Sequence, residues 1–137
     1  MPHLIVGILL SIIIVISGWL IYFYNSITNK KSRIEIEGEQ LNMLLNNRAE
    51  LIRLIKISEH YKYLSSDEDF VKLKQRFARL EEKLEESIQL YNNAVTIYNK
   101  FILTFPNNTA AVIIGIKELP YFNDELKTSI IYEGGRI

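Results

Sequence analysis

Residues 70–105 constrain the fold most strongly, because apolar or aromatic side chains recur there at seven-residue intervals. The repeat consists of Phe70, Phe77, Leu84, Tyr91, Tyr98 and Phe105. The intervening spacing of three or four residues is filled by Leu73, Leu80, Ala94 and Phe101. This period predicts one long helix with a single buried seam, of the coiled-coil type. Ile88, Val95 and Ile102 widen the stripe in its second half, which favours a helical bundle over a two-stranded coil.

Polar residues and a proline bound this predicted helix. Ser66 and the three acidic residues after it predict the start, since a serine cap and acidic side chains complement the positive end of the helix dipole. Pro106 predicts the end. We expect residues 61–66 to form the connection before the helix, and Asn107 and Asn108 to form a turn after it. An apolar segment, residues 109–116, follows.

The N-terminal residues 4–24 contain no charged side chain and consist mainly of Ile, Leu and Val. At about 1.5 Å per residue they span about 31 Å, which matches the hydrocarbon core of a bilayer. A cleaved signal peptide is the alternative. Because the first three residues lack a basic charge and no small-residue cleavage site follows, we expect residues 1–24 to form a retained transmembrane anchor.

Aromatic and basic residues at the end of this span predict its orientation. Trp19, Tyr22, Phe23 and Tyr24 are grouped where aromatic rings sit at headgroup depth. Lys30, Lys31 and Arg33 follow, and no Lys or Arg precedes the span. The positive-inside rule therefore predicts an external N-terminus and a cytoplasmic body.

Residues 25–58 contain no proline and keep a helical apolar stripe, so we expect the membrane helix to continue into the soluble part as one rod. Gly38 lies within it and predicts either a kink or a close helix contact. Arg48 lies beside the stripe. We expect its side chain to snorkel toward water or to pair with a carboxylate of the next helix, and not to bind a ligand.

These patterns predict an all-α fold, in which one transmembrane helix continues into an antiparallel helical hairpin or bundle over residues 25–120. We expect residues 121–137 to form a loosely ordered tail. The first arm rises about 50 Å and the second descends about 58 Å, so residues 109–116 return to the bilayer surface. The membrane-interface candidates are Trp19, Tyr22, Val112, Ile113, Ile114 and Ile116. Alternatively, residues 109–116 fold back and cap the core of the bundle.

The sequence predicts no catalytic, cofactor or metal site. Cysteine is absent, and sixteen basic residues balance sixteen acidic ones, which gives no electrostatic case for nucleic acid. His3 and His60 lie on opposite sides of the anchor and cannot share a metal ion. The acidic group Glu81, Glu82, Glu85 and Glu86 is interspersed with basic residues, which favours a solvated helix face over paired catalytic carboxylates.

Two Tyr-Asn steps stand one heptad apart, at Tyr91-Asn92 and Tyr98-Asn99. They could form a polar binding groove. We favour a structural role, in which both rings lie in the core and both asparagines bridge to a neighbouring helix or its cap.

The segment YNNAVTIYNKFILTFPNNTAA, residues 91–111, resembles the YNxAVxxYNxxIxxFPxN signature of LemA family proteins. Residues 59–73, EHYKYLSSDEDFVKL, are similar to a second family motif, and the late Tyr121-Phe122 step resembles the family's tail. The chain departs from the pattern at Gly38, where the family usually has tryptophan, and it lacks a stretch that members usually carry between the two arms. The resemblance implies that Tyr91, Asn92, Tyr98, Asn99, Phe105 and Pro106 are structural motif residues. It implies a single-pass membrane protein with a helical bundle and no known enzymatic activity.

We therefore expect a non-enzymatic, membrane-anchored scaffold of a bacterial inner or plasma membrane, with the lipid bilayer and a protein partner or a second copy as its contacts. Two alternatives remain open: a regulatory accessory subunit of a membrane enzyme or protease, and a hydrolase or metal-dependent enzyme that uses the acidic helix face from Glu81 to Glu86.

Overall fold

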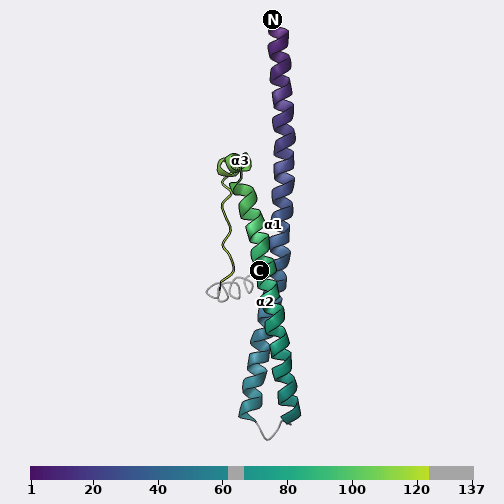
Figure 1. The fold of residues 1–137 in the computed structure, drawn as a ribbon, viewed down its shortest axis with the longest axis vertical. Coiled ribbons are helices and arrows are strands. Elements are labelled where there is room, and N and C mark those ends of the chain that lie inside the picture. Colours follow the sequence, from purple (N-terminus) through teal and green to yellow (C-terminus); the bar gives the residue numbers. More distant parts are fainter. Residues whose placement is uncertain (62–66, 124–137) are drawn as a thin grey trace.

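A computed structural model describes residues 1–61 and 67–123 of the protein (Figure 1). These residues form three helices. They are α1 (Pro2–His60), α2 (Asp67–Leu103) and α3 (Asn107–Ile114), and the described residues contain no strand. Helices α1 and α2 pack against each other as an antiparallel hairpin. The predicted all-α hairpin is therefore confirmed. The predicted connection is described only at Tyr61, and the Ser66 cap lies outside the described residues.

Helix α1 runs without a break through 59 residues, so the expected single rod is confirmed. Every residue from position 1 to position 18 is exposed, and Figure 1 shows this part as a rod that stands clear of the other helices. Packing begins at Trp19, where the side chain becomes half-buried. The rod thus has a lone apolar end and a packed end.

Two pairs of residues fix the register of the hairpin. A Cβ atom built on Gly38 would lie 3.3 Å from Cε2 of Tyr91, and Arg48 forms an ion pair with Glu81. The second pair is ten residues further along α1 and ten residues further back along α2, as antiparallel packing requires. Gly38 therefore marks a close helix contact, one of the two roles that we considered for it.

The core consists of two clusters. The cluster nearer the apolar end of α1, which we call the membrane-proximal cluster after the predicted anchor, contains Phe23, Ile27, Ile34, Ala94, Val95, Tyr98, Ile102, Ala110 and Ala111. The distal cluster contains Leu41, Leu45, Leu84 and Phe122. Both clusters lie where a third segment covers the two long helices, because two helices alone bury only one face of each other.

The predicted seam is wrong at its two ends. Phe105 is 79% exposed, since it lies beyond the end of α2, where the chain turns away. Phe70 and Phe77 are only half-buried, because no third segment covers this distal part of the hairpin in the described residues. The central position, Leu84, is buried as predicted.

The turn after α2 lies at residues 104–106, directly before the two asparagines where we predicted it. Asn107 and Asn108 are not a turn but the first residues of α3, and Pro106 occupies the N-cap position. Helix α3 ends at Gly115, whose left-handed φ of 84° suits a glycine, and the Ile116 N–H donates to Ala111 O at 2.8 Å. This cap reverses the chain direction.

After α3, residues 116–123 return along the hairpin, away from the free end of α1 (Figure 1). We call them the return segment. Phe122 is buried against Leu41, Leu45 and Leu84, so the loosely ordered tail that we expected from residue 121 does not begin there. Residues 124–137 of that predicted tail lie outside the described residues.

Candidate membrane interface

The two Tyr-Asn steps hold the return segment on the hairpin. Nδ2 of Asn99 donates to Leu119 O at 2.9 Å, and the Leu119 N–H donates to Asn99 Oδ1 at 2.8 Å. Oδ1 of Asn92 accepts from the Phe122 N–H at 2.8 Å. The asparagines bridge to extended backbone, whose amide groups need partners, and not to a neighbouring helix as we expected.

The tyrosines of the same steps are packing residues. Tyr98 is 1% exposed within the membrane-proximal cluster, and Tyr91 packs against Gly38 at the border of both clusters. Burial raises the pKa of both phenols above the ordinary value, since the charged form loses hydration. The two Tyr-Asn steps therefore do not provide ionised phenols to the polar binding groove that we considered as an alternative.

The pairing that we expected for Arg48 with a carboxylate of the next helix is confirmed. Its guanidinium bonds to Oε1 of Glu81 and lies 5.9 Å from the centre of the Phe77 ring. Glu82, Glu85 and Glu86 are exposed on the solvent side of α2. Because Glu81 is paired across the hairpin, the four acids do not act as one carboxylate cluster. Among the described residues, no group of three or more His, Asp or Glu side chains could hold a metal ion.

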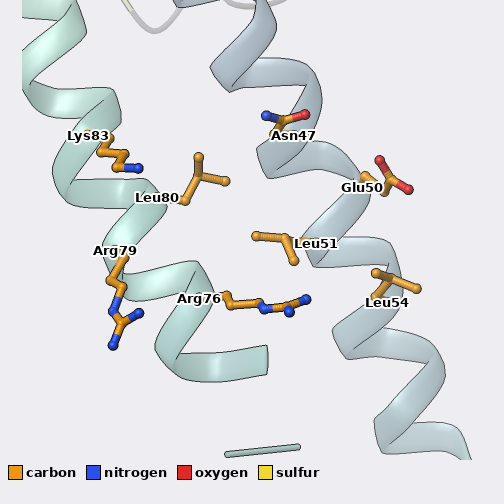
Figure 2. A pocket seen from close by; sticks show the side chains of 8 residues that line it. All are labelled: Asn47, Glu50, Leu51, Leu54, Arg76, Arg79, Leu80 and Lys83. Carbon is orange, nitrogen blue, oxygen red and sulfur yellow. The ribbon is translucent and has the colours of Figure 1, made fainter. Parts of the chain in front are cut away.

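A groove of about 450 Å³ lies between the arms in the distal part of the hairpin (Figure 2). Leu51 of α1 and Leu80 of α2 face each other across it. Its basic side chains, Arg76, Arg79 and Lys83, come from α2, and its one carboxylate is that of Glu50. This lining contains no histidine and no paired carboxylates, and the groove offers mainly cationic and apolar contacts.

Helix α3 divides into two faces at the membrane-proximal end. Ala110 and Ala111 are buried in the membrane-proximal cluster, whereas Val112, Ile113 and Ile114 are exposed. Ile116 is half-buried against the same cluster. Helix α3 therefore caps the core with its small residues and presents its large residues outward.

The two aromatic candidates on α1 differ in the same way. The Trp19 ring packs on Phe23, with their centroids 6.0 Å apart, whereas Tyr22 is exposed. Both lie at the end of the apolar part of α1, which is the one described helix that is long and apolar enough to cross a membrane. The apolar window of that helix is not buried by any other part of the structure.

In the comparison with protein families, the family model described as LemA family matches residues 23–129 of the chain. The chain belongs to the LemA family. The match begins at Phe23, the first buried residue of α1, and includes both arms of the hairpin, α3 and the return segment. Neither the search of curated proteins nor that of solved structures gave a match.

The LemA motif residues have distinct places in this structure. Tyr91 and Tyr98 pack in the core, Asn92 and Asn99 bind the return segment, and Pro106 caps α3. Phe105 departs from this pattern because it points outward. In this LemA protein the motif therefore holds α3 and the return segment on the hairpin.

Sequence reasoning missed two features of the packing on the hairpin. The Leu119 backbone and the Phe122 side chain are key contacts, and only the resemblance of Tyr121-Phe122 to the family tail pointed to that region. Glu37 is buried on the packed face of α1, where Arg33 Nε lies 3.3 Å from its Oε1. Its spacing, three residues after Ile34 and four before Leu41, places Glu37 on the apolar stripe of α1, and this periodic signal could have identified it as buried.

Proposed function

We propose that this LemA protein is a single-pass membrane-anchored scaffold that acts through protein or lipid contacts and has no enzymatic activity. The continuity of α1 is the observation that carries this proposal. One helix joins an uncovered apolar span to a packed hairpin, so the hairpin is attached rigidly to the span. The polar contacts across the hairpin support a structural role, because Arg48, Glu81, Asn92 and Asn99 are all engaged in holding the fold.

The orientation that we propose places the N-terminus outside and the hairpin in the cytoplasm of a bacterial inner or plasma membrane. Three basic residues, Lys30, Lys31 and Arg33, follow the span and none precedes it. Positive loops are retained on the cytoplasmic side of a membrane. Alkaline phosphatase fused after Ile137 should therefore be inactive in a bacterial host, and a fluorescent protein fused there should be bright. An active phosphatase fusion would reverse the orientation.

The scaffold role is tested by crosslinking the full chain in intact membranes and identifying its contacts by mass spectrometry. We expect crosslinks to a second copy or to a protein partner, and no new enzymatic activity in the purified protein. Purification at fixed stoichiometry with one membrane enzyme, together with a change in the rate of that enzyme, would favour an accessory subunit instead. A turnover that depends on Glu82, Glu85 or Glu86 would contradict the non-enzymatic proposal.

A further inference from the structure

We infer that α3 and the turn before it form a second membrane contact, which inserts Phe105, Val112 and Ile113 into the leaflet where α1 leaves the bilayer. The inference rests on the proposed membrane anchor and adds a lipid-binding surface to it. The occupant of the surface is the phospholipid leaflet, and not a protein.

The first argument is the exposed apolar side chains. Phe105, Val112 and Ile113 are each about four-fifths exposed, at 79%, 80% and 79%, and Ile114 is 60% exposed. No charged residue occurs between Lys100 and Lys117. Several large apolar side chains so exposed within one uncharged stretch often mark a site of interaction with a membrane or a protein.

The second argument is which face of α3 points inward. A helix whose only role is to cap a core buries its large apolar side chains, because burial of a branched side chain gains about 1.5–3 kcal/mol. Here the opposite holds, since the small Ala110 and Ala111 face the core and the three branched residues face outward. The small residues let α3 lie close to the hairpin, while the large ones remain available for a surface outside the protein.

The third argument is the position of α3 along the rod. Ala110 and Ala111 share a cluster with Phe23, and Trp19 packs on that cluster. Figure 1 shows α3 at the end of α2, beyond which α1 continues alone. A bilayer that covers residues 4–24 would therefore reach the level of α3, where the exposed apolar side chains of this helix lie.

The fourth argument is the charge at the border of this surface. Lys100 and Lys117 flank the uncharged stretch and are exposed, and Lys30 Nζ lies 4.4 Å from the centre of the Phe101 ring. Lysines at the edge of an apolar surface can place their ammonium groups among lipid phosphates while the neighbouring apolar side chains enter the acyl region. This arrangement favours a lipid surface over a protein partner.

The experiment uses site-directed nitroxide labels, for which the absence of cysteine in the chain is convenient. Single variants Ile113→Cys, Ile13→Cys and Val71→Cys of the full chain are labelled and reconstituted into vesicles of phosphatidylcholine and phosphatidylglycerol. All three positions are exposed in the structure, and they lie on α3, in the span and in the distal hairpin, respectively. Accessibility to oxygen, which partitions into lipid, is compared with accessibility to a water-soluble nickel complex.

We expect the Ile113 label to behave like the Ile13 label, with high oxygen accessibility and a loss of nickel accessibility relative to Val71. An Ile113 label as open to nickel as the Val71 label, with Ile13 still in lipid, would overturn the second contact and leave the anchor intact. An immobile Ile113 label closed to both reagents would also overturn it, because a protein surface then covers α3. Nickel accessibility at Ile13 would overturn the anchor, and with it the second contact.

Discussion

The side chain of Asn99 and the backbone of Leu119 exchange two hydrogen bonds, of 2.9 Å and 2.8 Å, which satisfy the N–H and C=O of one residue at once. A carboxamide has the same donor and acceptor as a peptide group, so Asn99 takes the place that a neighbouring strand would occupy. Together with Asn92, it fixes the return segment on the hairpin.

Replacement of Asn99 by alanine should therefore destabilise the protein more than replacement of a nearby exposed asparagine. Asn99→Ala leaves the Leu119 N–H and C=O without these partners, at about 1–3 kcal/mol for each group that stays buried. Asn93→Ala removes an exposed side chain one residue beyond Asn92 and should cost less than about 0.5 kcal/mol. Thermal unfolding of the full chain in detergent measures both. Equal effects would contradict the role of Asn99.

The Gly38–Tyr91 contact predicts a coupling between two substitutions. Alanine in a helix interior is favoured over glycine by about 1 kcal/mol, but here its Cβ would press on the Tyr91 ring. In a Tyr91→Ala background we expect Gly38→Ala to raise the unfolding free energy by about 1 kcal/mol. With Tyr91 present, the gain should be smaller or reversed. A double-mutant cycle on the full chain measures the difference, and additive effects would refute the close contact.

The central part of the seam predicts a large contrast between neighbouring positions. Leu84 is 3% exposed in the distal cluster, so Leu84→Ala should cost about 2–5 kcal/mol through lost burial and the cavity that it leaves. Glu82→Ala, at an exposed position, should cost less than about 0.5 kcal/mol. Denaturant unfolding in detergent distinguishes them. Similar costs would mean that Leu84 does not face the core.

Stability should fall in alkaline solution, because burial raises the pKa of Tyr91 and of Tyr98 above 10.0. Below pH 10 each phenol is protonated in both states and its contribution is complete. As the pH rises from 10 through the raised folded pKa, the unfolded chain releases these protons more readily, and the native state loses stability. Tyr98→Phe should reduce this decrease relative to the wild type. Unfolding midpoints measured from pH 8 to pH 11 test the sign, and a midpoint that rises with pH would contradict it.

The sequence was sufficient for features that repeat along a helix. The heptads placed α2 and its central seam residue Leu84, and the uncharged run placed the exposed part of α1. For Arg48, pairing with a carboxylate of the next helix was one of the two expected outcomes, and it is the one observed. Periodicity failed at Phe105, because it describes a helix and gives no warning of where the chain leaves its partner. It also gave no partner for Asn92 or Asn99. Their contacts are made with an extended segment 20 and 30 residues away, whose backbone groups carry no sequence signature.

The unbroken helix from Pro2 to His60 also transmits any tilt of its apolar end directly to the tip of the hairpin. With residues 4–24 as the proposed membrane anchor, residues 25–60 would extend about 54 Å beyond the bilayer, and a span tilt of about 20° would displace the hairpin tip sideways by about 18 Å. A transmembrane helix adjusts its tilt to bilayer thickness. In that arrangement the sideways position of the tip would depend on the lipid composition around residues 4–24, with no hinge in α1 to absorb the change.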